Sequence, residues 1–190
     1  MKIISIKSKR AAMEMSVGTM VTIVLLMCVL ILGIFLIEKI FTSAKGAIDL
    51  TDEQLRNEIN KLFGEESRIA IYPGNRLVKI KQENIDGVGI GIKNLLSGVG
   101  GTSTFSYQVV VSDPDLERKC GISEDRVLAW IVTGRSEVDI PIPSGSFSSQ
   151  KVLFEIPSGS PLCIIRFRVN VDADGTAYDT DFFDMSIKAK

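Results

Sequence analysis

The chain is 190 residues long, enough for one ordinary domain and one further segment, and its net charge of −1 argues against the basic surface that nucleic-acid binding requires. It contains no histidine, which excludes histidine-based catalytic triads and imidazole metal sites. Residues 1–14 carry four basic side chains and one acidic one, whereas residues 38–190 carry 18 basic and 22 acidic ones. The two ends of the chain are therefore expected to face different surroundings.

Residues 15–37 form a run of 23 residues without a charge, rich in Val, Ile, Leu and Met. As a helix rising about 1.5 Å per residue, this run would extend roughly 34 Å, more than a hydrocarbon core of about 30 Å. The pattern predicts a transmembrane helix in contact with membrane lipid. The basic cluster before it predicts a cytoplasmic N-terminus and an extracellular C-terminal part. No small-residue cleavage pattern follows the run, so we expect it to be retained.

The junction before this run resembles the class III leader of archaeal type IV pilins and archaellins. It consists of four residues, Arg10, Ala11, Ala12 and Met13. The following "MSVGTMVTIVLL" contains Gly18 and Thr19 and is similar to the start of archaellin helices. The resemblance implies that a prepilin-type peptidase cuts after Ala11. The alternative is an uncleaved single-pass anchor.

Glu14 is the one acidic residue ahead of the apolar run. A carboxylate near a helix N-terminus is stabilised by the helix dipole and by unpaired N–H groups, so one interpretation is a helix cap. If subunits assemble after cleavage, Glu14 would also attract the free amino group of a neighbouring subunit, and this pair could set the register between helices. Glu14, Gly18 and Thr19 are therefore candidate assembly residues.

The chain is expected to have four parts. These are a basic leader (1–11), the apolar helix with its extension (12–45), a linker (46–66) and a C-terminal domain (67–190). The linker contains "TDEQLRNEINKLFGEE", which predicts a short amphipathic helix with Thr51 as its N-cap and Gln54 completing a capping box. Apolar residues recur at helical spacing and predict a face packed on the following domain: Leu55, Ile59, Leu62 and Phe63.

From residue 68 onward apolar and polar residues alternate, which predicts seven to nine short strands. The stretch 126–133 is apolar on both faces and predicts a central strand, while Asp86 and Gly87 predict a turn. Alternation without intervening helices predicts an antiparallel sandwich. The other predicted strands lie around 68–72, 78–80, 88–92, 105–111, 137–142, 152–154, 163–171 and 182–188.

The strand pattern over residues 76–188 is similar to that of immunoglobulin-like sandwiches. "VGIGIKNLL" followed by "FSYQVVVSD" resembles a pair of their strands, and "FEIPSG" with "CIIRFRVNVDADGTAYDTDFF" resembles their closing hairpin. The Cys-Trp-Cys spacing of antibody domains is not matched. The predicted fold class is an N-terminal transmembrane α-helix plus an all-β antiparallel immunoglobulin-like sandwich, with a short linking helix.

Two of the three cysteines, Cys120 and Cys163, lie in the part predicted to be extracellular, where disulfides persist. We expect a disulfide between them, and we expect Cys28 to be a small apolar packing residue.

One oxygen-rich stretch, "DADGTAYDTD", contains Asp172, Asp174 and Asp179. Its glycine is fourth rather than sixth and its twelfth residue is Phe183, so the calcium-loop pattern is not met. We expect a solvated hairpin turn, with weak calcium binding as the alternative. No phosphate loop is present, and no cofactor is expected.

These patterns predict a structural cell-surface protein, a type IV pilin-like filament subunit that self-associates through its N-terminal hydrophobic helix. The alternative is an uncleaved anchor that displays an immunoglobulin-like binding domain outside the cell. An enzyme is not expected, because no catalytic motif is found.

Overall fold

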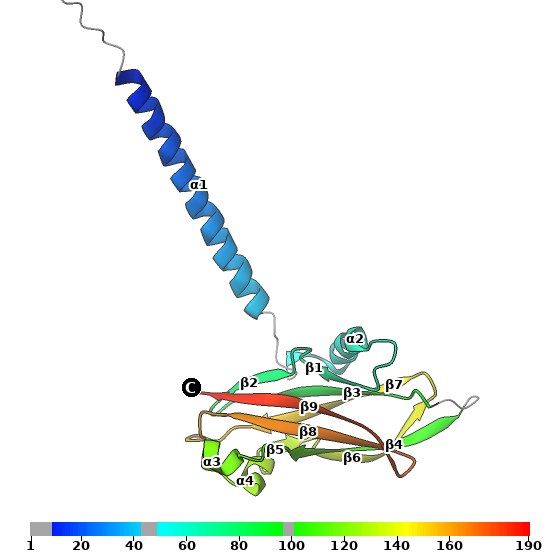
Figure 1. Ribbon diagram of the computed structural model, residues 1–190. Helices are drawn as coiled ribbons and strands as arrows, with labels where there is room; N and C mark the ends of the chain where they lie inside the picture. The colour runs from blue at the N-terminus through cyan, green and yellow to red at the C-terminus, as the bar shows by residue number, and fades with distance from the viewer. Residues whose placement is uncertain (1–8, 43–48, 97–100) are drawn as a thin grey trace, which may run out of the picture. The chain divides into compact units, whose positions relative to one another are not determined.

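The computed structural model describes residues 9–42, 49–96 and 101–190 (Figure 1). The chain separates into two compact units, Met1–Ala44 and Lys45–Lys190. Within the described residues, the first unit contains helix α1 (Lys9–Thr42), and the second contains three short helices and nine strands. The predicted leader begins in residues 1–8, which lie outside the described part, as does Gly46 of the linker.

The predicted transmembrane helix is the main correction to the fold class. Among the residues that the structure describes, no helix combines the length and the apolar character needed to cross a membrane. The prediction counted the uncharged run 15–37, whereas the described side chains of α1 are those of residues 18–34.

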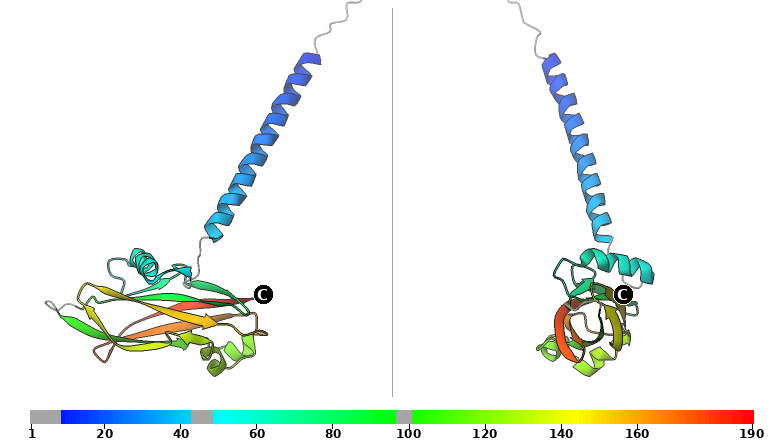
Figure 2. Two further views of the ribbon diagram at one scale, coloured as in Figure 1. Left: turned by 180° about the vertical axis from the view of Figure 1, so that it is seen from behind. Right: turned by 90° about the vertical axis from the view of Figure 1, so that its right-hand side faces the viewer.

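The second unit is a sandwich of two β-sheets, seen from three sides in Figures 1 and 2. The four-stranded sheet has the order β1-β3-β7-β5 and the five-stranded sheet the order β2-β9-β8-β4-β6. The prediction of an immunoglobulin-like sandwich is thus confirmed at the level of a two-sheet, all-β domain. The strands are β1 (Ile69–Tyr72), β2 (Leu77–Lys81), β3 (Ile85–Lys93), β4 (Thr102–Val111), β5 (Ile131–Thr133), β6 (Ser136–Pro143), β7 (Phe147–Glu155), β8 (Ile164–Ala173) and β9 (Thr176–Lys188).

The core lies between the two sheets and is centred on three aromatic rings. Phe154 of β7 faces Phe167 of β8 and Phe183 of β9, with ring centroids 5.1 Å and 6.0 Å from its own. Phe167 and Phe183 stack at 5.3 Å. All three side chains are fully buried. The alternation read from the sequence holds here, since every second residue of β8 from Ile165 onward is buried.

Helix α2 (Asp52–Leu62) covers the outer face of the four-stranded sheet (Figure 1). The predicted capping box is present: the Thr51 hydroxyl accepts from the backbone N–H of Gln54, whose side chain accepts from the N–H of Thr51. Leu55 and Ile59 are buried against Ala70 of β1. Leu55, Ile59 and Phe63 of the predicted face therefore pack on the sandwich, whereas Leu62 is 37% exposed.

The predicted central strand at 126–133 is wrong. Residues Glu124–Leu128 form helix α4, and only Ile131–Thr133 form a strand, β5, at the edge of its sheet. Helix α3 (Leu116–Cys120) precedes α4, so the expectation of no helices between strands is also wrong. A short apolar run suits a buried helix turn as well as a strand, and here Val127 and Trp130 are buried three residues apart at helical spacing.

Three pairing predictions also need correction. The sandwich is not purely antiparallel, because β2 pairs with β9 in parallel. Strands β3 and β4, expected to pair, lie in different sheets, as do β7 and β8; the closing hairpin is β8–β9. Asp86 and Gly87 lie inside β3 rather than in a turn, opposite Phe154 and Leu153 of β7. Strand partners depend on contacts far apart in the sequence, which local periodicity does not encode.

Candidate functional site

The described surface of α1 is apolar on all sides. Its polar residues in that stretch are Thr19 and Thr22. Thr22 donates its hydroxyl to the carbonyl oxygens of Gly18 (3.1 Å) and Thr19 (2.8 Å), which satisfies the group within the helix. Cys28 is exposed and has a free thiol. The large apolar side chains between Met20 and Ile34 are 51–70% exposed. They are Met20, Val21, Ile23, Val24, Leu25, Leu26, Met27, Val29, Leu30, Ile31, Leu32 and Ile34.

The predicted processing and assembly residues also map to α1. Gly18 and Thr19 are exposed in the part of α1 whose side chains are described, and a Cβ at Gly18 would meet no atom within 4 Å. The backbone of residues 10–14 belongs to the helix, but their side chains lie outside the described part. The cut after Ala11 and the role of Glu14 therefore stay predictions.

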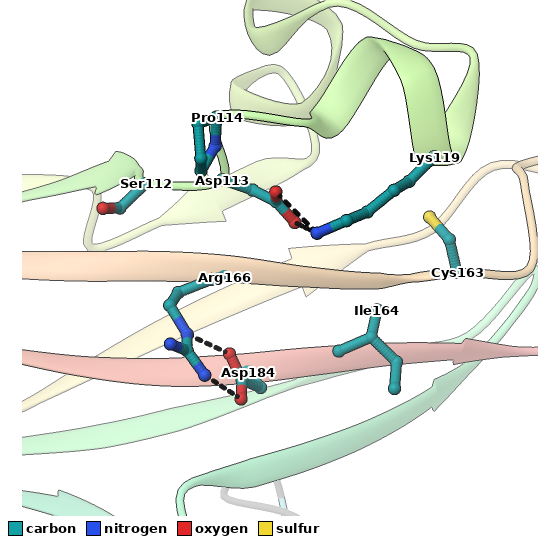
Figure 3. Close-up of a pocket in the computed structure, with 8 residues that line it drawn as sticks. All are labelled: Ser112, Asp113, Pro114, Lys119, Cys163, Ile164, Arg166 and Asp184. Atoms are coloured by element: carbon teal, nitrogen blue, oxygen red, sulfur yellow. Dashed lines mark hydrogen bonds and ion pairs between the residues drawn. The ribbon is translucent and has the colours of Figure 1, made fainter.

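Cys120 and Cys163 form the disulfide that the sequence suggested, with Cα atoms 5.8 Å apart. Cys120 ends helix α3, and Cys163 immediately precedes β8. The bond fastens the two short helices to the five-stranded sheet. A hollow of about 510 Å³ lies on the Cys163 side of this bond (Figure 3).

The hollow contains two ion pairs. Lys119 Nζ lies 3.1 Å from Asp113 Oδ1, and Arg166 forms a two-point pair with Asp184, at 2.8 Å for Nε–Oδ1 and 2.9 Å for Nη2–Oδ2 (Figure 3). Arg166 and Asp184 face each other on β8 and β9, which are paired in this register. Each cation has its own carboxylate, so the hollow offers no uncompensated charge to a ligand.

The electrostatics of the hollow follow from these pairs. Partial burial alone would raise the pKa of Asp113, but the hydrogen bonds from Lys119 and from the Asp115 N–H, with the charges of Lys119 and Arg166, outweigh it and lower the pKa. The hydrogen bond and charge of Asp184 raise the pKa of Arg166. The lowered pKa of Asp113 and the raised pKa of Arg166 both favour the charged form, which suits a structural role better than proton transfer.

An exposed aromatic side chain lies beside the hollow. Phe182 is 40% exposed, and the guanidinium carbons of Arg166 and Arg76 lie 4.5 Å and 5.4 Å from its ring centroid. Arg76 also pairs with Asp181 at 2.8 Å. Burial raises the pKa of Asp181 despite that pair. These contacts stiffen the outer face of the five-stranded sheet.

The acidic stretch at 172–181 is a hairpin turn. Asp174 and Gly175 have φ of 50° and 79° and connect β8 to β9, and Asp174 Oδ1 accepts from the N–H of Thr104 at 2.9 Å. Asp179 Oδ1 accepts from the N–H of Thr180. Across the described residues, no three acidic or cysteine side chains lie close enough together to hold a metal ion, and this includes Asp172, Asp174 and Asp179.

The charged residues of the hollow were not predicted from the sequence. Arg166 lies in the predicted strand 163–171, but its pairing with Asp184 depends on the β8–β9 register. Lys119 and Asp113 meet because α3 turns the chain back. Lys119 and Asp113 are six residues apart in the sequence, and Arg166 and Asp184 are eighteen apart. Neither spacing indicates an ion pair in a single sequence.

No protein-family model matches the chain, and no curated protein matches it. Solved structures give remote likenesses. The CARDB domain of a Pyrococcus furiosus protein, in complex with di-metal ions, has a TM-score of 0.38 and 10% identity over 64% of this chain and 94% of its own. A PapD-like domain of human CEP192 has a TM-score of 0.36 and 12% identity, over 68% of this chain and 93% of its own. A Pseudomonas fluorescens alkylpurine DNA glycosylase bound to DNA has a TM-score of 0.31 and 10% identity, over 70% of this chain and 34% of its own. Likenesses this remote carry no argument about function.

Proposed function

We propose that the protein is a structural subunit that self-associates through α1 and carries the β-sandwich as its displayed domain. The observation that supports this most is the apolar surface of α1, whose twelve large apolar side chains between Met20 and Ile34 are more than half exposed. A helix that is apolar all round is stable only when it is covered on all sides.

The energetics favour covering this helix with copies of itself. Burying a Val, Leu, Ile or Met side chain contributes roughly 1.5–3 kcal/mol when it is fully exposed beforehand. The twelve residues of α1 together outweigh an association cost of about 4–15 kcal/mol even when each gains only part of that amount. In a helical array of identical subunits, each helix has neighbours on several sides, and a contact that does not close on itself produces a filament.

The proposed filament belongs to the type IV pilin-like class. The leader-like junction at Ala11 would supply a new N-terminus at Ala12, and Glu14 would pair with that amino group on a neighbouring subunit. The Cys120–Cys163 disulfide supports a location outside the cell, where such bonds persist. The sandwich is then the outer, environment-facing part of each subunit.

Sedimentation velocity of the full chain beside a fragment of residues 49–190 tests the proposal. The fragment retains the core between the two sheets, so it should sediment as a folded monomer. The full chain should sediment as a polydisperse assembly that dissociates in detergent. A full chain that stays monomeric at the same concentration without detergent would contradict self-association.

A further inference from the structure

A second hollow, of about 280 Å³, lies on the Cys120 side of the disulfide. It is bounded by residues 120–122 at the end of α3, by Arg126 of α4 and by Trp130 on one side, and by the loop 157–161 between β7 and β8 on the other. Figure 1 shows α3, α4 and β5 gathered at one end of the sandwich. None of the residues that line this second hollow is acidic, in contrast to the hollow of Figure 3.

Arg126 supplies the charge of the second hollow. Its side chain is exposed at the end of α4, and within the described part of the chain no carboxylate pairs with it. By contrast, Arg166 of the first hollow and Arg118 of α3 each have a carboxylate oxygen at 2.8 Å. The positive charge of Arg126 is therefore uncompensated.

Trp130 supplies a second unused donor. The residue is 7% exposed, and its backbone is fixed on both sides: its N–H donates to the Val127 carbonyl, and its carbonyl accepts from the Glu155 N–H. The indole N–H has no acceptor among the described residues. Among the described residues, every buried side-chain nitrogen or oxygen atom has a hydrogen-bond partner. The indole nitrogen has none, so it is accessible to solvent. The small exposed portion of Trp130 thus includes a hydrogen-bond donor that no protein group of the described residues uses.

The opposite wall of this hollow is rigid. The Ser160 hydroxyl donates to the Pro157 carbonyl at 2.8 Å, and the Gln82 side chain donates to the Ser160 carbonyl. Ser158 is exposed at the turn between them, and its hydroxyl has no protein partner in the described residues. The hollow is therefore formed before any ligand arrives, which lowers the entropy cost of binding.

From these observations we propose that the hollow formed by Arg126, Trp130 and Ser158 binds a carboxylate of an acidic peptide side chain. One guanidinium and two neutral donors match the charge and the acceptor oxygens of a single carboxylate. A sugar acid fits less well, because sugars stack on open aromatic faces and the ring of Trp130 is almost wholly buried. The peptide is the partner class that the site selects, whether or not the protein forms filaments.

The protein has one tryptophan, so its fluorescence reports on this hollow alone. The full-length protein is titrated with N-acetyl-glutamate methylamide at constant ionic strength, with the isosteric glutamine compound as the neutral control. We expect a saturable emission change with the glutamate compound only. Arg126→Gln should weaken binding about tenfold or more, since a charge-assisted hydrogen bond is lost. Arg118→Gln, a matched exposed arginine in the last turn of α3, should leave binding unchanged.

Arg126→Lys keeps the charge but not the planar fork and should bind with intermediate affinity, which separates recognition from loss of folding. An equal response to the glutamine compound, or undiminished binding in Arg126→Gln with folding intact, would overturn the site. Tighter binding of glucuronate than of the glutamate compound would overturn the assignment to peptides.

Discussion

Gly91 of β3 lies directly beneath Ile59 of α2: a Cβ on Gly91 would come within 2.3 Å of Ile59 Cγ2. Gly89 has the same relation to Leu55, at 2.5 Å from its Cδ1. Gly89 and Gly91 thus clear a path for the helix on the outer face of the sheet. Their missing side chains explain why β3 is buried on both faces.

Gly91→Ala should lower the free energy of unfolding by about 1–3 kcal/mol, because a Cβ in that position forces Ile59 and Phe63 to move. Thermal unfolding of the variant and of Gly101→Ala provides the comparison. A Cβ at Gly101 meets no atom within 4 Å, so that variant should keep its stability. In an Ile59→Ala background the cost of Gly91→Ala should shrink, and an unchanged cost would rule out the proposed clash.

Removing the disulfide should destabilise the sandwich. Replacing both Cys120 and Cys163 with serine opens a loop of 43 residues, and we expect a loss of about 3–4 kcal/mol in chemical denaturation. Cys28→Ser is the control, since its thiol is free. If a reducing agent lowers the stability of the wild type no more than that of the double variant, the bond is absent from the protein in solution.

The stability of the sandwich should depend on acid through Asp113. Its pKa is lowered on folding, so its contribution is fully present above the usual aspartate value of 3.8 and is lost as the pH falls through the folded pKa. The wild type should therefore exceed Asp113→Asn in stability at neutral pH, and the gap should close in acid. Denaturant unfolding at several pH values measures this gap.

Asp181 should behave in the opposite way, because burial raises its pKa. A carboxyl whose pKa rises on folding costs stability as the pH increases past its unfolded value. The wild type should therefore gain stability relative to Asp181→Asn as the pH falls. Matching slopes for the two variants would contradict the assigned electrostatics.

Processing at Ala11 has a direct consequence for mass and assembly. The mature chain should begin at Ala12, and Ala11→Leu, which obstructs the cut, should give a heavier chain that fails to assemble. Glu14→Gln should leave the sandwich folded and abolish assembly, because an unpaired N-terminal amino group replaces an attractive pair. Mass spectrometry and sedimentation of both variants check this. Wild-type size and sedimentation in both would contradict the cut after Ala11 and the assembly role of Glu14.

Local patterns in the sequence were enough to predict the elements whose structure depends on neighbouring residues. The Thr51–Gln54 capping box and the alternating burial of β8 are examples, since each is set within a few residues. The prediction of a strand at 126–133 was wrong because buried residues spaced like Val127 and Trp130 occur in a helix turn as well as in a strand. The glycines of β3 did carry a signal, but it becomes readable only once α2 is known to lie above them.

The candidate sites were harder to predict for the same reason. The disulfide could be proposed, because two cysteines in one compartment leave few choices. The Arg166–Asp184 pair requires the β8–β9 register, and the pairing of Arg126 and Trp130 with the loop 157–161 requires the fold of both connections. Neither is encoded by local spacing.

Self-association through α1 is tested most directly by making its surface polar. Leu26 and Leu30 lie one turn apart on α1 and are 68% and 62% exposed. Sedimentation velocity of the full chain carrying Leu26→Asp and Leu30→Asp is compared with the wild type and with Val132→Asp, a matched change at a 49% exposed position of β5. We predict that the α1 variant sediments as a monomer while the wild type and Val132→Asp form large assemblies. An α1 variant that assembles like the wild type would contradict the proposed function.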